Sequence, residues 1–121
     1  MALSTLKKRA DFLRVRGGPR WSTPAFVLEA RAHSVDAQEP GARVGFTVSK
    51  KVGGAVVRNR VRRRLRALVA ALAPEKLRTG FDYVLIARPG AELRSYQDLA
   101  ADLDQALDRV HRPRGRERRS Q

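Results

Sequence analysis

The chain has 121 residues, a formal net charge of +14 at pH 7 and no cysteine. This length predicts a single domain, and the absence of cysteine excludes disulfides, thiol catalysis and cysteine-ligated metals. No apolar run is long enough to span a membrane and no signal-peptide pattern opens the chain, so we expect a cytoplasmic protein with no membrane partner. A charge of this size repels itself in a compact fold, and a phosphate backbone is the polyanion expected to relieve it.

A short helix and two strands are predicted in the first half of the chain. Leu6–Val15 is amphipathic, and Gly17-Gly18-Pro19 ends it. Pro24–Ala32 and Arg43–Ser49 alternate as strands do, and the aperiodic residues between them predict a loop that joins two antiparallel strands. The helix residues expected to face inward are Leu6, Leu13 and Phe12. The first strand carries Phe26 and Leu28 on one face and Val27 and Glu29 on the other.

The second half predicts a long helix, a strand and a last helix. Ala55–Leu72 is the long helix, and Phe81–Arg88 is a continuous apolar run typical of a buried central strand. Ser95–Val110 begins with a capping-box-like pair, Ser95 and Asp98. The apolar stripe of this last helix consists of Leu99, Leu103, Ala106, Leu107 and Val110.

This order of elements predicts an α+β sandwich with helices packed on a sheet. We expect one RNA-binding domain over residues 1–111. Residues 112–121 are rich in arginine and have no apolar residue to pack, so they predict a basic, disordered tail.

Residues 50–66 carry the most unusual pattern, with eight basic side chains and no acid in 17 positions. At about 100° per residue, Val57, Val61 and Leu65 fall on one side of the helix and arginines cover the rest. Like charges spaced by four destabilise a helix, so helix stability does not explain the pattern. Because violated local rules tend to mark functional sites, we infer a polyanionic partner with a shaped RNA surface.

Charge is also segregated along the chain. No acid occurs between Glu39 and Glu75, whereas the last helix has an acidic outer face. This distribution predicts a basic surface on one side of the molecule. Arginine far outnumbers lysine, and its planar guanidinium can make bidentate phosphate contacts or stack on bases.

Four segments resemble the bacterial ribonuclease P protein subunit. The most specific is RVGFTVSKKVGGAVVRNRVRRRLR at Arg43–Arg66, which is similar to that family's S-K-K and R-N-R signature. The supporting segments are LKKRADFLRV at Leu6–Val15, FVLEAR at Phe26–Arg31 and FDYVLIARPGA at Phe81–Ala91.

The resemblance implies a fold and an activity. The fold would be an α-β-β-β-α-β-α sandwich, similar to a domain of a ribosomal protein, with a four-stranded mixed sheet and a left-handed β-α-β crossover. The protein would form a 1:1 heterodimer with a catalytic RNA subunit, bind the 5′ leader of precursor tRNA and promote cleavage that yields the mature tRNA 5′ end. Mg²⁺ would be bound mainly by the RNA, and the protein would contribute no catalytic residue and no metal ligand.

The resemblance also implies two sets of site residues. One set would bind the 5′ leader and the other the RNA subunit. The region expected to bind the leader departs from the family pattern, because many relatives have an aromatic residue where this chain has Arg16 and Glu29. Arg16 can still stack on a base or contact phosphate. The leader set is Phe12, Arg16 and Phe26. The RNA-subunit set is Lys50, Lys51, Arg58, Asn59, Arg60, Arg62, Arg63 and Arg66.

Other functions are compatible with the composition. A structural RNA-binding protein, an RNA chaperone or a ribosomal protein would be equally basic, and only the specific motif separates these from a ribonuclease P subunit. A DNA-binding module is disfavoured because no helix-turn-helix pair surrounds the long helix. The two histidines, His33 and His111, have no partner at a catalytic spacing, so we expect both to be solvated and no autonomous catalysis.

Overall fold

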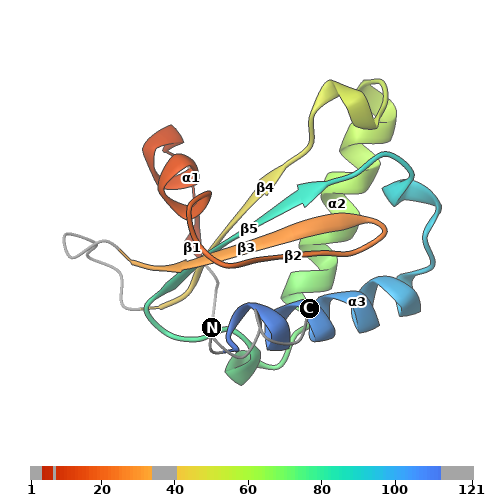
Figure 1. Cartoon of the computed structure of the whole chain (residues 1–121). Coiled ribbons are helices and arrows are strands. Elements are labelled where there is room, and N and C mark those ends of the chain that lie inside the picture. Colours follow the sequence, from red (N-terminus) through yellow and green to blue (C-terminus); the bar gives the residue numbers. More distant parts are fainter. Residues whose placement is uncertain (1–3, 7, 34–40, 113–121) are drawn as a thin grey trace.

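The computed structural model describes residues 4–6, 8–33 and 41–112, which form one mixed sheet with helices on both faces (Figure 1). The strands are β1 (Ser4–Thr5), β2 (Arg20–Ser22), β3 (Phe26–Ala32), β4 (Arg43–Thr47) and β5 (Phe81–Ala87). The α-helices are α1 (Arg9–Val15), α2 (Ala55–Ala70) and α3 (Tyr96–Val110). Three single 3₁₀ turns are η1 (Lys50–Val52), η2 (Pro74–Lys76) and η3 (Ala91–Leu93).

The strand order across the sheet is β1-β4-β5-β3-β2. Strands β4 and β5 are parallel neighbours joined by α2, so the chain contains a β-α-β crossover, whose left hand stays a prediction. The predicted α+β class and the four principal strands are confirmed, and the two-residue β1 adds a parallel edge beside β4. The predicted central position of β5 is also confirmed.

The two strands predicted to be antiparallel are not neighbours in the sheet. Strands β3 and β4 run in opposite directions but do not pair, because β5 lies between them, antiparallel to β3 and parallel to β4. The reason is the composition of β5, which is apolar on both faces and therefore occupies the position that is covered on both sides. Much of the loop predicted between β3 and β4, and the tail from residue 113, lie outside the described residues.

The face of the sheet under α2 and α3 holds the main core. Alternation along the strands sends Phe26 and Leu28 of β3, and Tyr83 and Leu85 of β5, to this face, as the sequence predicted for β3. Side chain Oγ of Ser95 accepts a hydrogen bond from the backbone N–H of Asp98, which confirms the predicted start of α3. The helices contribute Val61, Leu65, Leu68 and Val69 from α2, and Leu99, Leu103, Ala106, Leu107 and Val110 from α3.

Histidine 111 fastens the end of α3 to the sheet and is not simply solvated as expected. Its Nε2 lies 2.7 Å from the hydroxyl of Tyr83, which also accepts a hydrogen bond of 2.8 Å from the backbone N–H of Arg78. Burial lowers the pKa of His111, and the nearby Arg78 lowers it further, which favours the neutral ring in this contact. Burial raises the pKa of Tyr83, which keeps its hydroxyl a donor.

Among the residues that the structure describes, α1 and a small second core cover the opposite face of the sheet. Leu6, Val15 and Val84 are buried there, with Phe12 and Ile86 packed against them. The prediction that Leu13 faces inward is wrong, since 46% of this side chain is exposed. A helix of seven residues buries one narrow stripe, and Phe12 and Val15, three residues apart, occupy it.

The turn between α1 and β2 requires glycine because it passes very close to β3. A Cβ atom on Gly18 would lie 2.2 Å from the carbonyl oxygen of Ala30, and backbone cannot move aside as a flexible side chain can. The adjacent Pro19 carbonyl accepts a hydrogen bond of 3.0 Å from the N–H of Ala30, which holds the turn in place.

We expect Gly18→Ala to lower the free energy of unfolding by about 1–3 kcal/mol, the usual cost of forcing extra volume into a packed site. Urea denaturation monitored by circular dichroism measures this change. The matched control is Gly41→Ala, because a Cβ at that position meets no atom within 4 Å. Equal stability of the two variants would contradict the argument.

Candidate nucleic-acid interface

Helix α2 presents arginines on the surface that it does not bury. Its buried stripe of Val61, Leu65, Leu68 and Val69 packs on the sheet, and most of the side chains outside this stripe are exposed or half-buried. The η1 turn, which precedes α2, adds two exposed lysines. The structure therefore brings the predicted RNA-subunit set together on η1 and α2. Lys50, Lys51, Asn59, Arg60, Arg63 and Arg66 are exposed, and Arg58 and Arg62 are half-buried.

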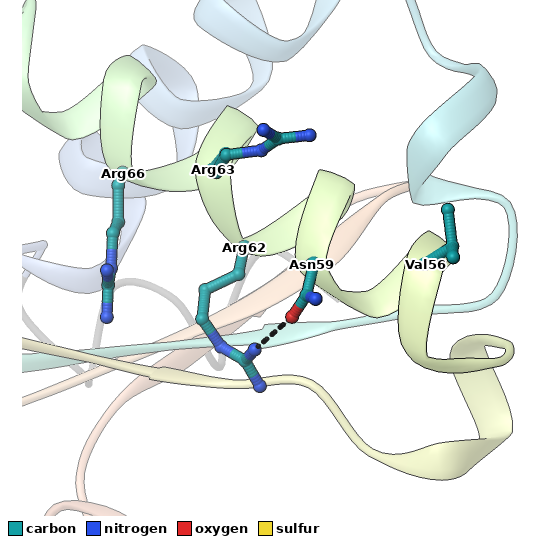
Figure 2. A pocket seen from close by; sticks show the side chains of 5 residues that line it. All are labelled: Val56, Asn59, Arg62, Arg63 and Arg66. Carbon is teal, nitrogen blue, oxygen red and sulfur yellow. Dashed lines mark hydrogen bonds between the residues drawn. The ribbon is translucent and has the colours of Figure 1, made fainter.

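An open pocket of about 510 Å³ follows this surface (Figure 2). Val56, Asn59, Arg62, Arg63 and Arg66 line it. Nη1 of Arg62 donates a hydrogen bond of 3.3 Å to Oδ1 of Asn59, which orients that guanidinium. Figure 2 shows Arg62 and Arg66 pointing in the same direction while Arg63 points away from them, so guanidinium groups lie on different sides of one helix.

The positive charge of this surface is not neutralised within the described part of the chain. None of the described arginines of α2 pairs with a carboxylate, and its first turn contains no acid. Three of the four carboxylates of α3, by contrast, have local partners: Asp102 with Arg94, Asp104 with Lys76 and Asp108 with Arg112. Eight cations of η1 and α2 thus lie within 17 residues without a carboxylate partner among the described residues.

Arg64 belongs to the same run of arginines but has a structural role. Its Nη1 donates a hydrogen bond of 2.9 Å to the carbonyl of Ala91, and its Nη2 donates to the carbonyl of Arg94. These bonds hold η3 against α2. The sequence did not indicate this role, because the acceptors are backbone atoms about 30 residues away.

The second surface lies beside α1 on the other face of the sheet. The ring of Phe12 rests on Gly45 of β4, where a Cβ would approach two ring carbons to 2.6 Å. Beyond α1, the cross-strand neighbours Thr47, Ile86 and Val27 are exposed or half-buried and leave this part of the sheet accessible. Arg16, at the end of α1, is exposed as well, so an aromatic ring, an apolar strip and a cation share one face.

Phe26 is not part of this surface, and its assignment to leader binding is wrong. The side chain is 0% exposed and lies in the main core under α2 and α3. Because Phe26 is two residues from Leu28 on the same strand, it shares that residue's face and points away from α1.

Glu29 does point to the face of α1, but its carboxylate is covered. The residue is 2% exposed, and Oε2 lies 3.7 Å from Nη1 of Arg20, its cross-strand neighbour on β2. Burial raises the pKa of Glu29, while Arg20 and then Arg16 act in the opposite direction. Repulsion between this carboxylate and a phosphate on the same face is thus reduced by two flanking arginines.

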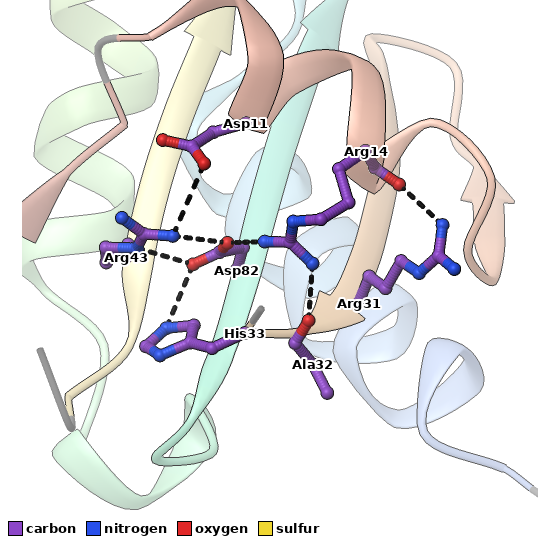
Figure 3. Close-up of polar contacts among 7 residues, drawn as sticks. All are labelled: Asp11, Arg14, Arg31, Ala32, His33, Arg43 and Asp82. Atoms are coloured by element: carbon purple, nitrogen blue, oxygen red, sulfur yellow. Dashed lines mark hydrogen bonds and ion pairs between the residues drawn. The ribbon is translucent and has the colours of Figure 1, made fainter. Parts of the chain in front are cut away.

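A buried carboxylate joins α1 to the sheet (Figure 3). Asp82 of β5 is 0% exposed; Nε and Nη2 of Arg43 each donate to it over 2.8 Å, and Nη2 of Arg14 donates to it as well. Nε2 of His33 lies 2.9 Å from its Oδ1, so His33 is not simply solvated either. One acid inside the apolar run of β5 was the only signal in the sequence, and its partners come from three other segments.

The family can now be identified from comparison. A model of the ribonuclease P family matches residues 2–111. The chain belongs to this family. Membership gives it a role in ribonuclease P, an endoribonuclease complex, and therefore in tRNA processing.

Individual family members support this result. The chain is 52% identical over 110 residues to the ribonuclease P protein component of Paramagnetospirillum magneticum. This alignment covers 89% of the chain and 83% of the relative. The chain is 43% identical over 113 residues to that of Ruegeria pomeroyi, covering 93% and 90%. The solved ribonuclease P protein of Staphylococcus aureus superposes with a TM-score of 0.72 at 26% identity, covering 92% of this chain and all of that one.

Two further properties of the described residues bear on partners. None of the helices in the described ranges is long and apolar enough to cross a membrane. Within the same ranges, His, Asp and Glu side chains form no group of three or more that could hold a metal ion.

We expect Arg64→Ala to lower the free energy of unfolding by about 1.5–3 kcal/mol, as for other hydrogen bonds that involve a charged group. The matched control is Arg63→Ala, because Arg63 is the adjacent arginine and is exposed. This substitution is expected to change the free energy of unfolding by less than about 0.5 kcal/mol. Thermal and urea unfolding of both variants measure the difference. If Arg64→Ala is as stable as the control, Arg64 does not hold η3.

Proposed function

We propose that this chain binds the catalytic RNA subunit of ribonuclease P through η1 and α2. The observation that carries the proposal is a set of guanidinium and ammonium groups on α2 and η1 that lack carboxylate partners in the part of the chain that the structure describes. Helix α2 is held against the sheet by its buried apolar residues, so these groups have a fixed support. Arginine forks match the geometry of phosphate oxygens, and neutralising a phosphate backbone releases counterions. The residues proposed to contact the RNA subunit are Lys50, Lys51, Arg58, Asn59, Arg60, Arg62, Arg63 and Arg66.

We also propose that the face beside α1 binds the single-stranded 5′ leader of precursor tRNA. Phe12 is half-buried at the edge of this face, and Arg16, four residues later, is exposed. Aromatic stacking combined with a cation is how proteins hold single-stranded RNA without strong sequence preference. Both surfaces together would place the substrate against the RNA subunit and promote cleavage at the mature 5′ end.

The chemistry of cleavage is assigned to the RNA. Carboxylates are the ligands that Mg²⁺ prefers, and those on the face of α1, Asp82 and Glu29, are already paired with arginines. We therefore propose that Mg²⁺, which activates the attacking water, is bound mainly by the RNA subunit. A 1:1 complex of protein and RNA in the cytoplasm is part of the same proposal.

Adding the protein to its catalytic RNA is expected to raise the rate of precursor-tRNA cleavage at low Mg²⁺, because fixed cations replace part of the divalent counterion charge. Single-turnover cleavage measures the rate, with RNA alone and protein alone as controls. The RNA should be folded before the protein is added. No gain with prefolded RNA would contradict the proposal and favour an RNA chaperone.

Arg60→Ala is expected to weaken binding to the RNA subunit and to flatten the dependence of log K on log salt by roughly one unit, because each phosphate contact contributes about that much. Filter binding over a salt series measures the slope. Lys76→Ala is the control, since it removes the same charge from a residue that pairs with Asp104 over 2.6 Å outside α2. Identical slopes for wild type and Arg60→Ala would show that Arg60 makes no phosphate contact.

A further inference from the structure

Helix α1 has little intrinsic reason to stay where it is. It has seven residues and no side-chain hydrogen bond at its N-cap, and isolated helices of this length are unstable in water. Its apolar contacts are confined to the small second core, and Leu13 contributes little to them. Other interactions must therefore fix the position of the helix on the sheet.

The buried carboxylate of Asp82 supplies these interactions. Arg14, the penultimate residue of α1, reaches Asp82 and also donates a hydrogen bond of 2.5 Å to the carbonyl of Ala32 at the end of β3. Arg43 binds both oxygens of Asp82 and lies 3.7 Å from Asp11 of α1. Figure 3 shows that Asp11 and Arg14 approach the strands from the same side, so α1 is tied to β3, β4 and β5 through one acid.

The same helix turn is held from a second direction. Nη1 of Arg31 on β3 donates a hydrogen bond of 2.8 Å to the carbonyl of Arg14, one of the C-terminal carbonyls that a helix leaves without an internal partner. Phe12 lies between Asp11 and Arg14, and Arg16 follows two residues later. Any change in the placement of α1 moves both residues of the leader surface.

We propose that Asp82 is a positioning residue for the 5′ leader: its buried carboxylate sets the place of α1, and so of Phe12 and Arg16, over the sheet. This inference rests on the proposed function of that face. Asp82 itself is fully buried and touches no RNA. Helix α2, which carries the RNA-subunit surface, packs on the opposite face of the sheet through a separate core. Loss of the Asp82 network is therefore expected to impair leader binding but not binding to the RNA subunit.

The test uses the reconstituted holoenzyme and two precursor tRNAs, one with a leader of several nucleotides and one trimmed to a single leader nucleotide. The ratio of their affinities reports leader binding, and a separate titration reports affinity for the RNA subunit. Asp82→Asn keeps the shape of the side chain but removes its charge. We expect it to reduce the ratio about fivefold or more, the cost of losing roughly one stacked base, with RNA-subunit affinity nearly unchanged.

Two further variants guard against a failure to fold. Arg14→Gln removes one cationic partner of the network from a partly exposed position and is expected to reduce the same ratio. Asp102→Asn is the matched control, because it breaks another arginine–aspartate pair, with Arg94 on the side of α3. This control should leave the leader ratio at the wild-type value.

A double-mutant cycle separates positioning from general destabilisation. If Asp82 acts through Phe12, then Asp82→Asn has little further effect on the leader ratio in a Phe12→Ala background. The inference is overturned if folded Asp82→Asn and Arg14→Gln keep the wild-type ratio, if RNA-subunit affinity falls equally, or if the two substitutions act additively. A wild-type enzyme that ignores the leader would instead overturn the proposed leader surface itself.

Discussion

Strand β5 is covered on both faces, and this constraint organises the rest of the molecule. Its odd-numbered residues, such as Tyr83 and Leu85, pack against α2 and α3, while Asp82 and Val84 meet α1. Because successive side chains on a strand point in opposite directions, a one-residue slip of β5 would place the carboxylate in the apolar core. Burying an unpaired charge there is far more costly than the paired arrangement observed, so the register of the central strand is strongly specified.

The separation into two faces lets two demands on the sequence coexist. Helix α2 can carry a run of arginines that weakens it locally, because its stability comes from the buried stripe led by Val61 and Leu65. The face of α1 can remain partly open, because the main core does not depend on it. The chain thus carries a run of arginines without carboxylate partners in the described ranges on one helix and the half-buried ring of Phe12 on another.

Local patterns were enough to predict most of the elements, and they failed where contacts between distant segments decide the outcome. Period-two alternation correctly separated Phe26 and Leu28 from Val27 and Glu29, yet the leader role inferred for Phe26 came from resemblance and ignored that same alternation. The position of β5 between β3 and β4 depends on which strand is best buried on both sides. For Asp82, the partners lie 39 and 68 residues away, and no spacing in the sequence reveals them.

The contact between Phe12 and Gly45 limits how this chain can diverge. The aromatic ring occupies the volume that any larger residue at position 45 would need. A bulkier residue at position 45 is tolerated only if residue 12 is smaller or displaced. The effects of substitutions at these two positions are therefore expected to be coupled, although 33 residues separate them. In this chain, a side chain at position 45 therefore requires that the ring of Phe12 first be removed or displaced.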